Sequence, residues 1–259
     1  MHAIVLAGGK GTRLLPRTEQ LPKPLLRFGP YPLLEIIVRR LRSAGFTRVT
    51  LCVSHLGEMI EEAFGDGHRL DVEIDYVRDE APLGTAAPLL AVREWRAPAV
   101  VTNGDVLSAV DFAELYRAHR HRTGGLTVVV HRLHAPISYG VVDTDGTDRI
   151  TAIREKPLLP VDVAAGVYVA DPAVRRYIPA GTPLDMPELI ERLIAGAQRV
   201  GAYRFDGPWH DIGDPDSYQA AQLDFAASPE RYLRADTEPP APAAASPFVL
   251  SDTSLQEHR

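Results

Sequence analysis

The sequence has a single cysteine, no long apolar run and no excess of positive charge. Cys52 cannot form an internal disulfide, and within the apolar run 49–53 we interpret it as a small buried hydrophobe. No apolar stretch reaches the roughly 18 residues that a membrane span requires, and the chain meets glycines too early for a signal peptide. The net charge of -6 argues against a broad basic surface for nucleic acid. We therefore expect a soluble, cytoplasmic protein that binds neither membranes nor nucleic acid.

The first half of the chain alternates between short β-branched runs and amphipathic helical patterns. We expect strands at residues 3–7, 48–54, 72–77, 99–102 and 126–131, and helices at 33–44, 58–64, 85–95 and 111–121. Strands separated by helices of about ten residues predict βαβ units, in a mostly parallel α/β sheet with helices on both faces. Ligands of such sheets bind beyond the carboxyl ends of the strands.

The second half of the chain contains more strand patterns than the first. Residues 140–143 and 150–155 flank a turn at Asp145-Gly146 and predict a hairpin, with a further strand at 163–170. We expect these strands to form a second, β-weighted lobe packed on the same sheet, followed by helices at 185–195 and 215–226. The Pro- and Ala-rich end of the chain cannot build a core, so we predict one domain over residues 1–235 and a flexible tail over 236–259.

The strongest functional signal is the run Leu-Ala-Gly-Gly-Lys-Gly-Thr-Arg-Leu at residues 6–14, followed by Pro-Lys-Pro at 22–24. Three glycines directly after a predicted strand let the backbone bend sharply and approach a ligand, and successive N–H groups there can form an anion site. Arg13 adds a planar fork for phosphate oxygens, and Lys23 adds a point charge. A glycine-rich turn that only links strand to helix is the alternative. The run matches neither a Walker loop nor a dinucleotide fingerprint.

Together with later motifs, this run resembles the sugar-1-phosphate nucleotidyltransferases, in particular members that transfer guanylyl groups to mannose or heptose 1-phosphate. The later motifs follow in the family's order over roughly residues 1 to 225: Pro82-Leu83-Gly84-Thr85-Ala86, Asn103-Gly104-Asp105, Tyr139-Gly140-Val141-Val142, Glu155-Lys156-Pro157, Ala165-Gly166-Val167-Tyr168 and Trp209-His210-Asp211-Ile212-Gly213. The resemblance implies a Rossmann-like, mostly parallel sheet with a smaller β-rich sugar-binding lobe, the nucleotide-diphospho-sugar transferase fold. It also implies that an NTP and a sugar 1-phosphate are joined, with release of pyrophosphate.

The resemblance further implies which residues bind the nucleotide, within about residues 1–135. The implied positions are Leu6, Ala7, Gly8, Gly9, Gly11, Thr12, Arg13, Lys23, Glu80, Gly84, Thr85, Asn103, Gly104 and Asp105. Asp105 and Asp211 are similar to the family's metal ligands, and two carboxylates with phosphates or waters suit Mg²⁺. Arg13, Lys23 and Lys156 are the implied catalytic cations, because the reaction needs charge neutralisation rather than acid–base chemistry.

The sugar phosphate is implied to bind within about residues 136–225. The implied positions are Tyr139, Gly140, Glu155, Lys156, Ala165 and Gly166. The sequence departs from the family at Ala164, where many relatives carry an asparagine that would bond a sugar hydroxyl. This departure affects the expected sugar and leaves the expected reaction unchanged.

Several alternatives stay open at this point. GTP is favoured as the nucleotide, while UTP, dTTP or CTP could replace it, and a cyclitol phosphate could replace the sugar phosphate. A non-catalytic, nucleotide- or sugar-sensing subunit on the same fold is the alternative from another class. A homo-oligomer is compatible with the sequence.

Overall fold

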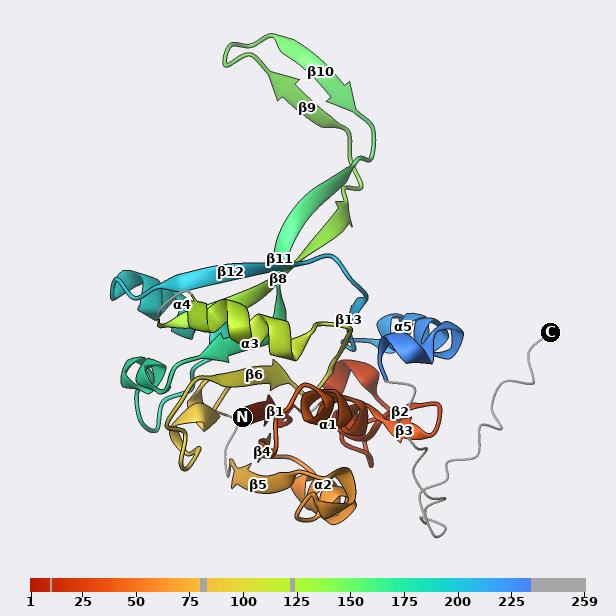
Figure 1. Ribbon diagram of the computed structural model, residues 1–259. Helices are drawn as coiled ribbons and strands as arrows, with labels where there is room; N and C mark the ends of the chain where they lie inside the picture. Colours follow the sequence, from red (N-terminus) through yellow and green to blue (C-terminus); the bar gives the residue numbers. More distant parts are fainter. Residues whose placement is uncertain (10, 80–82, 122–123, 234–259) are drawn as a thin grey trace, which may run out of the picture.

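The computed structural model describes residues 1–9, 11–79, 83–121 and 124–233, and a seven-stranded sheet runs through them (Figure 1). Its strands lie in the order β12 (Val200–Phe205), β8 (Leu126–Pro136), β11 (Leu158–Ala170), β6 (Ala99–Asn103), β1 (His2–Leu6), β4 (Arg48–Val53) and β5 (Glu73–Arg78). The last four of these are parallel neighbours, whereas β11 runs antiparallel to β6 and β8. Because four parallel strands are adjacent, their carboxyl ends form one continuous edge of the sheet.

Helices cover both faces of this sheet, which confirms the predicted fold class (Figure 1). One hydrophobic cluster takes buried side chains from α1 (Leu33–Ser43), α2 (Gly57–Phe64), α3 (Phe112–His121) and α5 (Pro215–Ala227). A second cluster takes buried side chains from α4 (Met186–Ala195) and from the segment before β6.

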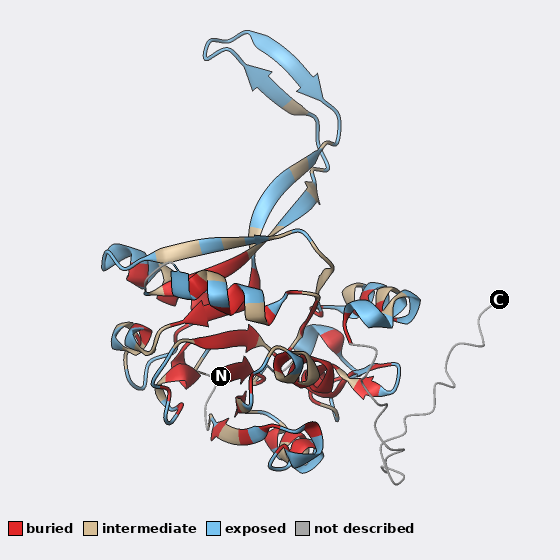
Figure 2. Ribbon diagram, viewed as in Figure 1, coloured by how far each residue is buried: buried red, intermediate tan, exposed pale blue. Residues whose placement is uncertain are grey.

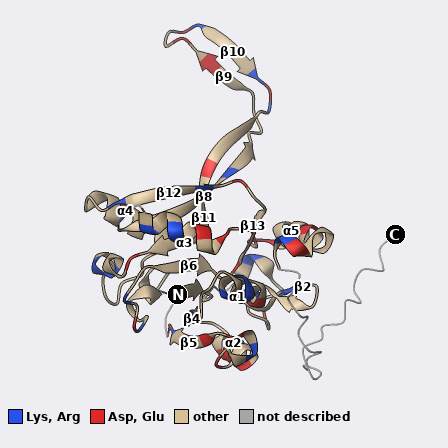
Figure 3. Ribbon diagram, viewed as in Figure 1, with Lys and Arg blue, Asp and Glu red and all other residues tan. Residues whose placement is uncertain are grey.

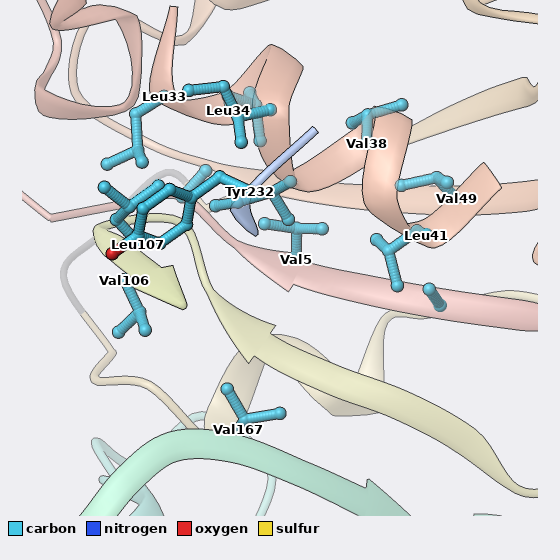
Figure 4. Close-up of a cluster of buried hydrophobic side chains, with 14 of the residues drawn as sticks. Val5, Leu33, Leu34, Val38, Leu41, Val49, Val106, Leu107, Val167 and Tyr232 are labelled. Atoms are coloured by element: carbon cyan, nitrogen blue, oxygen red, sulfur yellow. The ribbon is translucent and has the colours of Figure 1, made fainter. Parts of the chain in front are cut away.

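The central strand β1 shows why both faces must be covered. Its side chains alternate between the clusters, with Ala3 and Val5 in the first and Ile4 and Leu6 in the second. Figure 4 shows part of the first cluster, where side chains of α1 lie over Val5. Figure 2 shows the central strands buried and the outer helix surfaces exposed. A strand that is apolar on both faces has to be covered on both sides of the sheet, which agrees with the βαβ arrangement predicted for the first half of the chain.

The helix predicted at residues 85–95 is wrong. The described part of this segment holds only a 3-10 turn, Ala87–Leu90. Pro88 has no N–H to donate and disfavours helical geometry at the residue before it. The N–H groups of Ala86 and Ala87 instead donate to the carbonyl oxygen of Leu184, at 2.9 and 3.3 Å. Glu94 also takes φ of 51°, outside the helical region, so the segment docks on the chain before α4 without continuing as a helix.

Several elements, most of them short, were not predicted from the sequence. They are β2 (Arg27–Phe28), β3 (Tyr31–Pro32), β7 (Val106–Ser108) and β13 (Trp209–Asp211), together with the edge strand β12 and the 3-10 segments Thr12–Leu14, Lys23–Leu25, His68–Leu70, Pro172–Tyr177 and Pro229–Arg231. Two or three residues carry too little periodicity to be recognised as strands. The pair β7 and β13 nevertheless matters, because it positions Asp211.

The predicted hairpin is present as β9 (Val141–Thr144) and β10 (Ile150–Arg154), but it does not pack on the sheet. β8 and β11 are longer than predicted and stay paired from Arg132 with Asp162 to Pro136 with Leu158, where they continue into the hairpin. We call residues 132–162 the arm. Figure 1 shows the arm projecting from the sheet. The expectation of a packed β-rich lobe is therefore corrected to an extended ribbon, because the arm has no helix beside it to bury a face.

Two expectations from composition can be compared with the structure. Cys52 is buried in β4, and burial raises the pKa of its thiol well above the usual range, which agrees with its interpretation as a core hydrophobe. Among the described residues, no helix has the length and apolarity needed to cross a bilayer. The tail predicted at 236–259 lies outside the described residues.

We predict that Leu51→Ala lowers the free energy of unfolding by about 2–5 kcal/mol, because Leu51 is fully buried between β1 and β5 and its loss leaves a cavity. The matched control is Leu223→Ala on α5, whose side chain is 66% exposed and should change stability by less than about 0.5 kcal/mol. Denaturant unfolding measures both values. Equal losses in the two variants would contradict the core that we describe.

Candidate functional site

The candidate site forms where the carboxyl ends of β1 and β6 meet. Gly104 follows β6 and donates its N–H to the carbonyl oxygen of Leu6, at 2.8 Å. A Cβ at position 104 would lie 3.2 Å from the Cα and Cβ atoms of Ala7, so a side chain there would crowd the two strand ends. The predicted nucleotide-binding motifs at residues 6–14 and 103–105 are therefore in direct contact.

The glycine-rich loop is held by its carbonyl groups. The hydroxyl of Ser54, after β4, donates to the carbonyl of Gly8, and Thr18 Oγ1 donates to the carbonyl of Gly11 at 2.7 Å. Gly11 has φ of 62°, the left-handed region in which glycine is favoured. Within the described residues, the N–H groups of Gly8, Gly9, Gly11 and Thr12 have no protein acceptor. The loop therefore offers N–H donors to an anion, as its sequence predicts.

An ion pair with a buried lysine joins this loop region to the segment that follows β6. Lys23 Nζ lies 2.6 Å from Asp105 Oδ2, and the two side chains are 8% and 31% exposed. Lys23 begins a 3-10 turn between two prolines, which restrict the backbone that carries it. A lysine ammonium this deeply buried needs an ionic partner, and Asp105 provides it.

Asp211 joins the cluster through the short pair β7–β13. Asp211 stands opposite Val106 in this pair, and the N–H of Ile212 donates to the carbonyl of Asp105 at 3.0 Å. Partial burial raises the pKa of Asp211, and the neighbouring Asp105 carboxylate raises it further, against the opposing effect of Lys23 and Arg13. Two carboxylates that sequence alone separates by more than a hundred residues therefore share one electrostatic environment.

Arg13 completes this cluster of charges. A Cβ built on Gly213 would lie 3.3 Å from Arg13 Nη2, so the guanidinium rests against the bare backbone after β13. Hydrogen bonds from Ser217 lower the pKa of Asp214, and the nearby charge of Arg13 lowers it further. The cluster thus holds the cations of Arg13 and Lys23 beside the carboxylates of Asp105 and Asp211.

Two carboxylates make a partial ligand set for a divalent metal. Among the described residues, no three His, Cys, Asp or Glu side chains gather into a metal-binding group. Mg²⁺ commonly takes one or two carboxylates and fills its remaining positions with phosphate oxygens and waters. Lys23 contacts Oδ2 of Asp105, which leaves Oδ1 without this partner. The residues present therefore fit a metal that is shared with a phosphate ligand.

Ala165 and Gly166 reach the same region through a bulge in β11. The register between β11 and β8 shifts between Ala164 and Tyr168, and Gly166 takes φ of 69°. A Cβ at Gly166 would lie 2.8 Å from Asn103 Nδ2, and Asn103 Oδ1 is buried with no partner among the described residues. This orphaned oxygen is a free acceptor directly beside the Asp105 cluster.

Gly84 and Thr85 lie against the start of α4. The N–H and the hydroxyl of Thr85 both donate to Asp185 Oδ1, at 2.9 and 3.2 Å, and Thr85 Oγ1 accepts the N–H of Met186 at 2.8 Å. Gly84 has φ of 84°, and a Cβ there would lie 2.6 Å from the carbonyl oxygen of Leu184. The polar groups of Thr85 therefore cap α4 in this structure. Glu80, predicted beside them, lies outside the described residues.

The remaining predicted sugar-phosphate residues, Tyr139, Gly140, Glu155 and Lys156, lie together on the arm. A Cβ built on Gly140 would lie 3.2 Å from Glu155 Oε2, and Tyr139 is 78% exposed. In the described part of the chain, no hydrogen bond or ion pair links Glu155 or Lys156 to the Asp105 cluster. The structure therefore brings the nucleotide-loop and metal residues together, and it does not bring the arm residues to them.

Sequence reasoning missed three residues that shape the site: Thr18, Ser54 and Trp209. The first two fix the glycine loop, and Trp209 donates from Nε1 to the carbonyl oxygen of Ala165 at 2.9 Å. Trp209 could have been identified, because it opens the motif that contains Asp211. A serine after a strand and a threonine in a loop carry no comparable pattern.

We predict that Asp211→Asn raises the melting temperature at pH 7, by on the order of 1–2 °C, in metal-free buffer with chelator. Partial burial and Asp105 raise the pKa of Asp211 in the folded state, so its charged form opposes folding above that pKa. The gain should shrink as the pH falls toward 4, because protonation removes the same charge from the wild type. The control Asp148→Asn, at an exposed turn, should show no gain. A gain that is independent of pH would contradict this electrostatic origin.

Comparison with known proteins agrees with the geometry. Residues 2–228 match the family model described as nucleotidyl transferase. The chain is 36% identical to a mannose-1-phosphate guanylyltransferase of Mycobacterium tuberculosis and 34% identical to a UTP–glucose-1-phosphate uridylyltransferase of Synechocystis. These alignments cover 87% and 85% of this chain but 64% and 62% of the relatives, so the chain spans a little under two thirds of their length.

A solved structure shows the same fold. It is described as a putative glucose-1-phosphate thymidylyltransferase from Bacillus anthracis in complex with a sucrose, and it matches with a TM-score of 0.70 and 26% identity. The match covers 86% of this chain and 94% of that one, which confirms the expected nucleotide-diphospho-sugar transferase fold. By sequence and by fold, this chain belongs to the nucleotidyl transferase family.

Proposed function

We propose that the protein joins an NTP to a sugar 1-phosphate and releases pyrophosphate. The observation that carries the proposal is the cluster of Arg13, Lys23, Asp105 and Asp211 beside unpaired N–H donors of the glycine loop. This arrangement suits a polyphosphate, because it combines fixed cations, backbone donors and carboxylates able to share a metal. The relatives named above catalyse this class of reaction, as their names state.

In the proposed reaction, a phosphate oxygen of the sugar 1-phosphate attacks the α-phosphorus of the NTP in line. One new P–O bond forms, the bond from the α-phosphorus to the bridging oxygen breaks, and pyrophosphate leaves with that electron pair. The nucleophile is already an anion near neutral pH, so the site has to position two anions and neutralise their charge. Arg13 and the glycine loop bind the triphosphate, and Lys23 holds the Asp105 carboxylate in place through its hydrogen bond to Oδ2.

Asp105 and Asp211 would hold Mg²⁺ together with phosphate oxygens. The metal, when bound, would neutralise charge on the phosphates and on the leaving pyrophosphate. The orphaned Asn103 Oδ1 stands beside this position as an acceptor for a ribose or sugar hydroxyl. Ala164 on β11 has no polar side chain that could bond a sugar hydroxyl, so other residues would have to recognise the sugar.

GTP with a mannose-like sugar 1-phosphate is the favoured substrate pair. This preference rests on the guanylyltransferase relative at 36% identity and on the motif around Gly84 and Thr85. A uridylyltransferase relative follows at 34%, so UTP is the first alternative. dTTP, CTP and cyclitol phosphates complete the set to be tested. NTPs are available in the cytoplasm, which is the location we propose.

The deciding experiment measures pyrophosphate release with Mg²⁺, for five NTPs paired with a panel of sugar 1-phosphates. Release that needs both substrates supports the proposal and names the base. No release from any pairing, in folded protein that still binds an NTP, would point to an acceptor outside the panel. NTP binding that changes only the activity of a partner protein would favour the sensing subunit.

We predict that Arg13→Ala and Asp105→Asn each lower turnover by about 10²–10³-fold while the protein stays folded, because each removes a preorganised charge from the site. Asn at 105 keeps an oxygen for Lys23, so this variant avoids leaving the buried ammonium without an acceptor. The control is Arg96→Ala, whose side chain is 83% exposed and lies just before the amino end of β6, away from the site. Turnover of Asp105→Asn near the wild-type value would contradict the metal assignment.

A further inference from the structure

His210 stands between Trp209 and Asp211 on β13, but its ring bonds to α5 and not to the charged cluster of the candidate site. Side chains alternate across a strand, so His210 and Asp211 lie on opposite faces of β13. His210 Nε2 donates to Asp224 Oδ2 on α5 at 3.0 Å. Figure 3 shows β13 beside α5, on which acidic residues are coloured red. The histidine therefore joins β13 to α5 from the face behind Asp211.

Asp224 is itself held by two further donors. The hydroxyl of Tyr232 donates to Oδ2, and Arg231 Nη1 lies 3.4 Å from Oδ1. Tyr232 is fully buried, and its ring packs against Phe225 at a centroid distance of 5.8 Å. The hydrogen bond from Tyr232 lowers the pKa of Asp224 most, and the bond from His210 lowers it next. Asp224 is therefore a charged acceptor near neutral pH.

The segment that supplies Tyr232 is in turn anchored on α1. Arg40 donates from Nη1 to the carbonyl oxygens of Arg231 and Tyr232, at 3.1 and 3.2 Å. From Nη2 it donates to the carbonyl oxygen of Val110 at 2.7 Å, shortly after β7. β7 is the strand that pairs with β13. The support behind β13 is therefore a closed ring of contacts that runs through α5 and α1 back to β7.

β13 depends on such support because it is short and leads almost directly into α5. It has three residues, and only residues 212–214 separate Asp211 from α5. So short a strand makes few ladder hydrogen bonds that could fix its direction. The bond from His210 to Asp224 joins residues on either side of this junction, so it fixes how β13 lies against α5. Asp211 stands at the junction and takes its position from it.

We propose that His210 is a positioning residue, which holds β13 against α5 through Asp224 and so fixes the Asp211 carboxylate beside Asp105 for a shared divalent metal. The metal role of the two carboxylates rests on the proposed function. Asp105 and Asp211 carry like charges in one electrostatic environment. A support that keeps them together without a metal favours metal binding, because less ordering then remains to be done when the metal binds.

The first test measures Mn²⁺ binding to the metal-free protein, by electron paramagnetic resonance of the free ion. We expect His210→Ala to raise the Kd for Mn²⁺ by about three- to tenfold, because it removes an outer support of a metal ligand without touching the ligand. His210→Gln should bring the Kd back to within about twofold of the wild type, because the glutamine amide can donate to Asp224. An unchanged Kd in His210→Ala, or a glutamine variant as weak as the alanine variant, would overturn the proposal.

A matched control separates positioning from stability. His119 on α3 is also a histidine with a side-chain hydrogen bond, between its Nδ1 and Thr127 Oγ1 at 2.8 Å. Thr127 lies near the amino end of β8, level with the amino end of β6 and at the opposite edge of the sheet from the site. His119→Ala should lower the melting temperature without changing the Kd for Mn²⁺. Equal losses of Mn²⁺ affinity in the two histidine variants would identify lost stability as the cause and overturn the proposal.

The second test asks whether His210 acts through Asp224. The Kd for Mn²⁺ is measured for His210→Ala, for Asp224→Ala and for the double variant, all in a Tyr232→Phe background. The background removes the buried hydroxyl that would otherwise lose its acceptor when Asp224 is replaced. If one bond carries the effect, the double variant binds Mn²⁺ no more weakly than the weaker single variant. Losses that multiply would show two independent effects and overturn the route through Asp224.

The tests separate this proposal from the proposed function. Mn²⁺ binding needs no substrate, so it decides about His210 even if no substrate pair releases pyrophosphate. If the wild type turns over and His210→Ala binds Mn²⁺ as tightly, the reaction stands and the positioning role fails. A wild type that binds no Mn²⁺ overturns the positioning role, while pyrophosphate release still decides about the reaction.

Discussion

The ion pair between Lys23 and Asp105 is the interaction on which the candidate site depends. It joins the segment after the glycine loop to the end of β6, across 82 positions of sequence. Because the lysine side chain is only 8% exposed, losing its carboxylate partner would leave a buried charge uncompensated. The backbone carbonyl of Asp105 also accepts the N–H of Ile212, so a third segment is fixed to the same residue. One aspartate thus organises three parts of the chain.

Asp105 also contributes to an unfavourable electrostatic interaction within the site. Partial burial and then the neighbouring Asp105 carboxylate raise the pKa of Asp211, so its charged form raises the free energy of the ligand-free protein. Lys23 and Arg13 offset this repulsion in part. A bound metal with its phosphates would remove it, so the charge arrangement is better suited to the occupied site than to the empty one.

The sheet could be predicted from the sequence because its central strands are apolar on both faces and separated by helices of regular period. The glycine loop and Gly104 could be located for a local reason, since glycines directly after strands indicate close backbone approach. The pairing of Asp105 with Asp211 could be found only through resemblance. It depends on β7 and β13, three residues each, whose partner is more than a hundred positions away. The failed helix at 85–95 has a local cause, because Pro88 disfavours helical geometry at the residue before it and Glu94 takes φ of 51°, outside the helical region.

The course of the arm was also beyond sequence reasoning, and the reason is physical. The turn at Asp145-Gly146 fixes that a hairpin forms, but the direction of a hairpin depends on what it packs against. Almost every residue of β9 and β10 is exposed, so the described chain offers the hairpin no packing surface that a local pattern could have indicated.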